Sequence, residues 1–66
     1  MRITVNGAPA EVADGTTVAD LVAARAVEHR RVAVAVGADV VPRSRWTSTV
    51  LVEGDTVEVL VAVAGG

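Results

Sequence analysis

The sequence predicts an α+β domain in which a mixed sheet of four to five strands packs on one main helix. Three observations carry this prediction. The 66 residues suffice for only one compact core, strand-like segments outnumber the single helix-like one, and the last strand can pair beside the first. With 52% apolar residues and no cysteine, that core must be hydrophobic and without disulfides. We expect one domain over residues 1–66.

The first two strands form a hairpin. Residues 1–5 alternate apolar and polar side chains, which is the period of a half-buried strand. Asn6-Gly7 follows and suits the positive φ angles of a type I′ turn. Residues 8–13 are expected to return as the second strand, with Pro9 tolerated at a sheet edge.

One helix follows the hairpin. Residues 14–16 predict a turn, Thr17 an N-cap, and Asp20 the third helical position, close to a capping box. The helix is expected to run for two to three turns, to Ala26. Its apolar stripe has the spacing i, i+3, i+4 and consists of Val18, Leu21 and Val22.

The second half predicts further strands. Residues 32–36 form a continuous Val/Ala run, expected of a central strand buried on both faces. Residues 40–41 predict a short edge strand that ends at Pro42, and residues 43–50 an irregular segment with a helical turn around 44–46. After a turn at 53–55, the last strand is expected over 56–63, with one wholly apolar face made by Val57, Val59, Val61 and Val63. This order of elements is that of the β-grasp, or ubiquitin-like, fold.

Composition excludes several functions. A net charge of −2 and a single aromatic residue do not suit nucleic-acid binding, which favours a basic footprint and stacking platforms. One histidine, His29, and no cysteine give neither a metal cluster nor a nucleophile–base pair. Signal-peptide and membrane-spanning segments are not apparent, so we expect a cytoplasmic, non-enzymatic protein. Trp46 is expected to cover the core with its indole N–H bonded to a carbonyl.

The sequence ends in Val63-Ala64-Gly65-Gly66. Glycines lack a Cβ, so such a tail can thread a narrow slot and present the Gly66 carboxylate there. Together with Val41-Pro42-Arg43-Ser44-Arg45-Trp46 and Gly54-Asp55, this tail resembles the ThiS/MoaD family of bacterial sulfur carrier proteins, over the whole length. The Val-Pro-Arg-x-x-Trp segment and the short length favour the members that serve thiazole formation in thiamine biosynthesis.

The resemblance implies the chemistry and the partners. A ThiF- or MoeB-like adenylyltransferase would adenylate Gly66, using ATP and magnesium, while the carrier itself binds no cofactor or metal. A persulfide sulfur donor would then convert Gly66 to a thiocarboxylate, and a ThiG-like thiazole synthase would take the sulfur. Gly65, Ala64 and Val63 would contact the partners, with Arg43 or Arg45 at the rim of a docking surface on the sheet near the tail.

Three alternatives stay open. The same chemistry could serve molybdopterin or another sulfur pathway. A ubiquitin-like modifier would end in an isopeptide bond on a target lysine, and a plain β-grasp interaction module would not need the tail. Membrane and nucleic-acid partners are not expected. The donor, the docking residues and the oligomeric state do not follow from the sequence.

Overall fold

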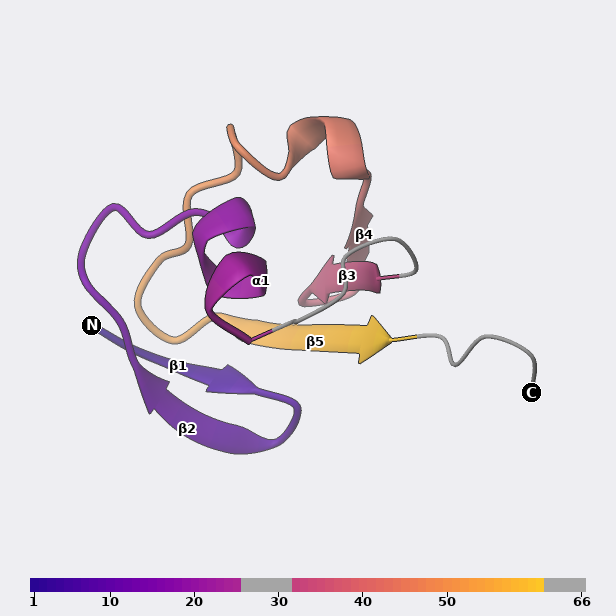
Figure 1. Cartoon of the computed structure of the whole chain (residues 1–66). Helices are drawn as coiled ribbons and strands as arrows, with labels where there is room; N and C mark the ends of the chain where they lie inside the picture. The colour runs from indigo at the N-terminus through magenta and orange to yellow at the C-terminus, as the bar shows by residue number, and fades with distance from the viewer. Residues whose placement is uncertain (26–31, 62–66) are drawn as a thin grey trace.

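The computed structural model describes residues 1–25 and 32–61, which form one five-stranded sheet and a helix (Figure 1). The strands lie in the order β2-β1-β5-β3-β4. Strand β5 pairs in parallel with β1 and antiparallel with β3, so the sheet is mixed. In chain order the elements are β1 (Arg2–Val5), β2 (Ala8–Glu11), α1 (Val18–Arg25), β3 (Val32–Val36), β4 (Asp39–Val41), the 3₁₀ turn η1 (Arg43–Arg45) and β5 (Thr56–Val61).

The first hairpin has the predicted turn. Asn6 and Gly7 adopt φ angles of 51° and 84°, as a type I′ turn requires. Pro9 lies on β2, which is an edge strand, so its missing N–H leaves no gap inside the sheet. The expected second strand of 8–13 was too long. It ends at Glu11, opposite Arg2, because β1 begins there and only the Val12–Met1 backbone pairing continues.

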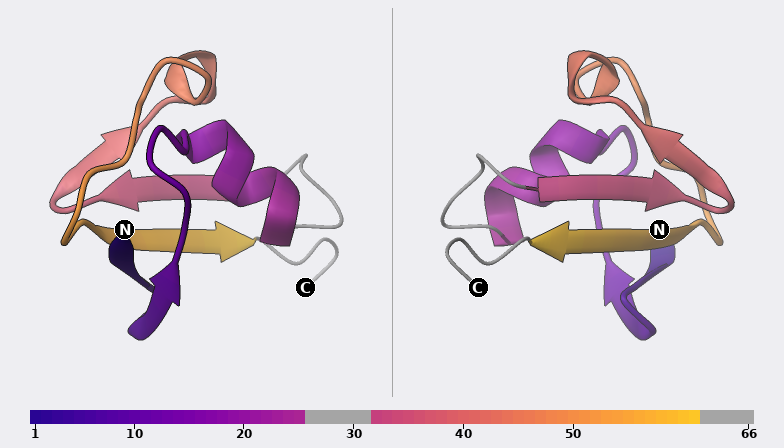
Figure 2. Two further views of the ribbon diagram at one scale, coloured as in Figure 1. Left: turned by 90° about the vertical axis from the view of Figure 1, so that its left-hand side faces the viewer. Right: turned by 90° about the vertical axis from the view of Figure 1, so that its right-hand side faces the viewer.

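Helix α1 begins as predicted. The Thr17 Oγ1 accepts a hydrogen bond from the Asp20 N–H, and an Asp20 carboxylate oxygen accepts one from the Thr17 N–H, each at 3.1 Å. This reciprocal pair satisfies two backbone donors that a helix start otherwise leaves without partners. Figure 2 shows α1 in front of the sheet in one view and behind it in the other, so the helix covers one face.

That one-sided cover corrects the prediction for residues 32–36. Val32 and Val34 are buried, but Ala33 between them is exposed. Strand β3 is therefore buried on the helix face only. A run of Val and Ala carries no polar residue to mark its open face, and small alanines expose little apolar surface. The periodicity therefore could not distinguish one-sided from two-sided burial.

The remaining elements match the expectations, with one difference in burial. Strand β4 is a short edge strand that ends before Pro42, and the helical turn is η1. In β5, Val57 and Val59 are 0% and 8% exposed, whereas Val61 is 54% exposed. The apolar face of the last strand is thus buried only in its first part. The predicted end of this strand at residue 63 and of the helix at residue 26, and His29, lie outside the described residues.

The core lies between α1 and the covered face of the sheet, and Trp46 and Leu51 close it from the long segment before β5. Aliphatic side chains make up all of it except Trp46. Within the part of the chain that the structure describes, no helix is long and apolar enough to cross a membrane. The buried hydrophobic residues are Ile3, Val5, Val18, Leu21, Val22, Val32, Val34, Trp46, Leu51, Val57 and Val59.

Candidate functional site

The candidate site is the end of β5 and the tail that continues from it. Val63, Ala64, Gly65 and Gly66, which the sequence predicts as the reacting and partner-contacting residues, lie outside the described residues. The structure shows how the strand leading to them is held. It also shows which surfaces surround the end of that strand.

Strand β5 lies between its two neighbours. Toward β1 the parallel register pairs Thr4 with Thr56 and Val5 with Val57. Toward β3 the antiparallel pairing extends to the end of the described strand, with Val61 opposite Val32. The tail-bearing strand is therefore a central strand, and its direction is fixed by both neighbours (Figure 1).

The structure places Arg43 at the end of the sheet from which the tail continues. Strands β4 and β5 both run antiparallel to β3, so they point the same way, and Val34 pairs with both Val41 and Val59. Arg43 follows β4 by two residues and is exposed. Arg45, the other arginine predicted for the rim, lies two residues further on and is also exposed, and the role of either arginine in partner contact stays a prediction.

Trp46 holds Arg43 and the end of β4 together. The Trp46 indole N–H donates a hydrogen bond to the Val41 carbonyl at 2.9 Å, and the Arg43 guanidinium carbon lies 4.8 Å from the centre of the indole ring. A guanidinium at this distance over a Trp face is attracted by the ring electrons. Trp46 is only 7% exposed, so the prediction of a core-covering Trp bonded to a carbonyl is confirmed.

An apolar patch lies on the open face of the sheet, opposite α1. Side chains alternate between faces along each strand, and the registers pair Ala33 with Leu60 and Ala35 with Val40. Val40 is 74% exposed and Leu60 is 64% exposed. We call these four residues the open-face patch: Ala33, Ala35, Val40 and Leu60.

Apart from the exposed Pro9 opposite Thr4, the rest of the open face is polar. Thr4, Thr56 and Glu58 lie on the same face, together with the Arg2–Glu11 pair of the first hairpin. The polar residues therefore lie mainly on β1, β2 and the first part of β5, and the apolar ones on β3, β4 and the end of β5. Three residues of the open-face patch lie on β3 and β4. The fourth, Leu60, lies near the end of β5, from which the chain continues into the tail.

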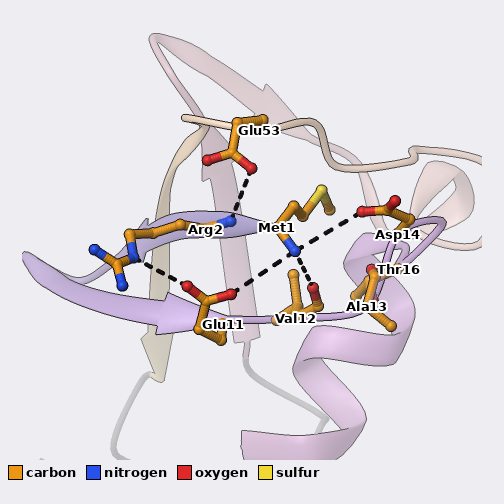
Figure 3. A network of polar contacts seen from close by, with 8 residues as sticks. All are labelled: Met1, Arg2, Glu11, Val12, Ala13, Asp14, Thr16 and Glu53. Atoms are coloured by element: carbon orange, nitrogen blue, oxygen red, sulfur yellow. Dashed lines mark hydrogen bonds and ion pairs between the residues drawn. The ribbon is translucent and has the colours of Figure 1, made fainter.

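Polar contacts at the opposite end of the sheet have a structural role (Figure 3). The Met1 ammonium donates to the Val12 carbonyl at 2.7 Å and lies 3.8 Å from carboxylate oxygens of both Glu11 and Asp14. The Arg2 Nε donates to Glu11 at 3.0 Å, and the Arg2 backbone N–H donates to Glu53. These carboxylates join the start of β1 to the neighbouring turns, as solvated charges at turns commonly do.

Metal ligands do not gather in the described structure. Over residues 1–25 and 32–61, no three His, Cys, Asp or Glu side chains lie close enough to hold a metal ion. The Asp55 carboxylate accepts a hydrogen bond from the Val52 N–H at 2.9 Å and so closes the turn before β5. Among the described residues, those near the end of β5 include an arginine, Arg43, and the apolar open-face patch.

Sequence reasoning missed one residue near this strand end. The prediction assigned Asn6 only to the hairpin turn, but its side-chain amide makes two hydrogen bonds to Val59 on β5. The partners are 53 residues apart in the sequence, so local patterns carry no signal for this contact. Only the parallel pairing of the first and last strands brings them together.

Comparisons with known proteins agree over the whole chain. The model of the ThiS family matches residues 3–66. A crystal structure of the thiamine biosynthesis protein (ThiS) from Geobacter metallireducens superposes with a TM-score of 0.84 at 33% identity, covering 100% of both chains. An NMR solution structure of a thiamine biosynthesis protein from the same organism gives 0.82 at 35% identity, covering 100% of this chain and 88% of the other. No curated protein matches the sequence at a significant level.

Proposed function

The chain belongs to the ThiS family, and from this premise we propose that it is a sulfur carrier protein of thiamine biosynthesis. The observation that carries the proposal is the family match through residue 66, joined to full-length likeness to a thiamine biosynthesis protein. The match includes the Gly-Gly tail, which holds the atoms that such a carrier would use. The protein would be the substrate of other enzymes rather than an enzyme.

The proposed chemistry takes place on the Gly66 carboxylate. A carboxylate is a poor electrophile, so a partner adenylyltransferase of the ThiF or MoeB type activates it with ATP and magnesium, forming an acyl adenylate and pyrophosphate. The terminal sulfur of a donor persulfide attacks the acyl carbon, and AMP leaves. A second donor thiol then opens the acyl disulfide, which leaves a disulfide on the donor and a thiocarboxylate on Gly66. A thiazole synthase of the ThiG type receives this sulfur.

The residue types of the tail suit this chemistry. The three residues 64–66 span at most about 10 Å when extended, and a Cβ at position 65 or 66 would obstruct a slot shaped for bare backbone. The chain has no lysine and no cysteine. The activated terminus therefore meets no side-chain amine or thiol of its own molecule.

The open-face patch supports a docking role. It is apolar, exposed and continuous with the strand that leads to the tail, and Arg43 stands at the same end. We propose that the adenylyltransferase and the thiazole synthase dock on this patch in turn, with Arg43 at its rim. A small interface of this kind suits a carrier that must leave one enzyme before visiting the next.

The proposal predicts a chemical modification of Gly66 that mass spectrometry can detect. The protein is isolated from cells starved of thiamine, and its intact mass and C-terminal fragments are measured. We expect one oxygen replaced by sulfur on Gly66. Fragmentation is needed because oxidation of Met1 or Trp46 adds nearly the same mass. A tail that stays unmodified would contradict the proposal, and adducts on target lysines would favour a ubiquitin-like modifier.

Two variants make the test specific. Gly66→Ala should block charging and leave the fold unchanged by circular dichroism. Gly54→Ala should still be charged but should be less stable to unfolding. Gly54 has a φ of 87°, and an added side chain there is strained, at a cost of about 1 kcal/mol or more. A Gly66→Ala chain that is charged at the wild-type rate would contradict the role given to Gly66. The synthase that accepts the charged carrier distinguishes thiazole formation from another sulfur pathway.

A further inference from the structure

Asn6 holds the last strand close to the point from which the tail continues. Its Nδ2 donates to the Val59 carbonyl at 3.1 Å, and the Val59 N–H donates to its Oδ1 at 2.8 Å. We propose that Asn6 is a positioning residue for the carboxyl-terminal tail, acting through Val59. This inference rests on the proposed function, since it gives the tail a reaction to be positioned for.

The Asn6 amide takes the place of a missing rung in the sheet. Along the parallel β1–β5 pair, the Thr4 N–H donates to the Asp55 carbonyl and the Asn6 N–H to the Val57 carbonyl, each at 2.9 Å. The next rung would need a backbone donor for the Val59 carbonyl and an acceptor for its N–H. The chain cannot supply them, because it turns back at Gly7 and pairs along β2. The side chain supplies both.

Asparagine meets two requirements at this position that other residues meet only in part. Asn6 has a φ of 51°, and it is the one non-glycine residue with positive φ among those described. Asparagine tolerates this conformation, as does aspartate. Only the neutral amide also offers a donor and an acceptor on one short side chain. Glycine would meet the conformational requirement of the turn alone. Aspartate would meet it and also accept from the Val59 N–H, but it could not donate to the Val59 carbonyl.

Val59 is the last residue of β5 that is both buried and held on its two neighbouring sides. It is 8% exposed and hydrogen-bonded on the β1 side through Asn6, and it pairs with Val34 on the β3 side. Leu60 and Val61 are 64% and 54% exposed. The seven residues from 60 to 66 reach at most about 25 Å. Val59 is thus the last residue of β5 held from both sides, whereas Leu60 and Val61 pair with β3 only.

The first experiment tests the clamp itself by amide hydrogen exchange. In Asn6→Gly, which keeps the positive φ, protection of the Val59 amide should fall about fivefold relative to that of Val57, as loss of a typical hydrogen bond implies. Asn6→Asp should keep most of this protection, because it retains the acceptor. Ile3→Val is the matched control: it removes one core methyl group on the same hairpin and should lower both amides together.

The second experiment tests positioning, with the adenylyltransferase that charges the wild-type chain and an ATP–pyrophosphate exchange assay. A variant that docks normally but directs its tail wrongly should be adenylated with a kcat about tenfold or more below that of the wild type. Its KM as the carrier substrate should stay within twofold. Asn6→Gly should show this pattern, and Asn6→Asp, which keeps the acceptor for the Val59 N–H, should lower kcat less. Loss of folded protein alone raises the apparent KM and leaves kcat unchanged, which is the pattern expected of Ile3→Val.

The outcomes separate the two proposals. If the wild type is charged and both Asn6 variants keep the wild-type kcat, positioning by Asn6 is wrong and the carrier function stands. Unchanged Val59 protection in Asn6→Gly overturns the clamp on its own, whatever the activity. If the wild-type chain is not adenylated, the proposed function fails and the positioning role fails with it, while the exchange data still decide whether the clamp exists.

Discussion

At the scale of single residues, the protein uses a few polar side chains to complete its backbone pairing. Asn6 and Trp46 each bond to a backbone group on another element, namely Val59 and Val41. Both targets lie in strands that end on the side of the molecule from which the tail continues. A core of small aliphatic side chains cannot fix strand ends by shape alone, so directional hydrogen bonds supply part of the order there.

Trp46→Phe tests this role of a polar group. The change removes the indole N–H, so the Val41 carbonyl loses its 2.9 Å partner and part of the packed volume is emptied. We expect the free energy of unfolding to fall by about 2 kcal/mol. Denaturant unfolding should be followed by circular dichroism, because Trp46 is the only tryptophan. An unchanged midpoint would show that the hydrogen bond and the packing contribute little.

At the scale of elements, local sequence signals predicted starts and turns better than strand lengths or burial. Asn6-Gly7 and the Thr17–Asp20 pair act between near neighbours, and both appear as predicted. The end of β2 depends instead on where its partner β1 begins, and burial of β3 depends on which face α1 covers. These are long-range properties, and no periodicity within 8–13 or 32–36 contains them.

The same limit applies to the candidate site. Val-Pro-Arg-x-x-Trp and the terminal glycines could be recognised as a pattern, but the pairing of Asn6 with Val59 and the apolar patch could not. The open-face patch joins residues of three strands whose order in the sheet differs from their order in the chain. Leu60 read alone is an ordinary strand residue. It becomes a docking candidate only when the sheet pairs it with Ala33 and brings Val40 of β4 onto the same face.

Thr17→Ala tests the start of α1. The change removes the hydroxyl that accepts from the Asp20 N–H, and loss of an N-cap of this type costs about 1 kcal/mol. The helix is only eight residues long as described, so it depends on capping and packing rather than on propensity. Thr47→Ala, at an exposed threonine outside the helix, is the control and should change the unfolding midpoint little. Equal midpoints for the two variants would contradict the capping role.

At the scale of the whole molecule, the two faces of the sheet differ in burial and composition. Helix α1 packs on the covered face (Figure 2), and the buried core there provides the stability. The open face carries exposed apolar side chains, among them Val40 and Leu60. A domain of this size has little core to spare. Leaving Val40 and Leu60 exposed therefore costs solubility without adding stability, and the proposed contact with a partner would be a physical reason to keep them.

Leu60→Asp tests whether the open-face patch is the docking surface. A carboxylate within an apolar interface is desolvated on binding without a partner charge, so KM for the carrier in the adenylation assay should rise about tenfold or more. Val50→Asp is the matched control, since Val50 is also exposed, at 54% against 64% for Leu60, but lies outside β5 and the patch. Both variants should unfold at similar denaturant concentrations. A KM raised equally by the two would show a general effect of negative charge, and a KM raised by Val50→Asp alone would move the docking surface to the segment before β5.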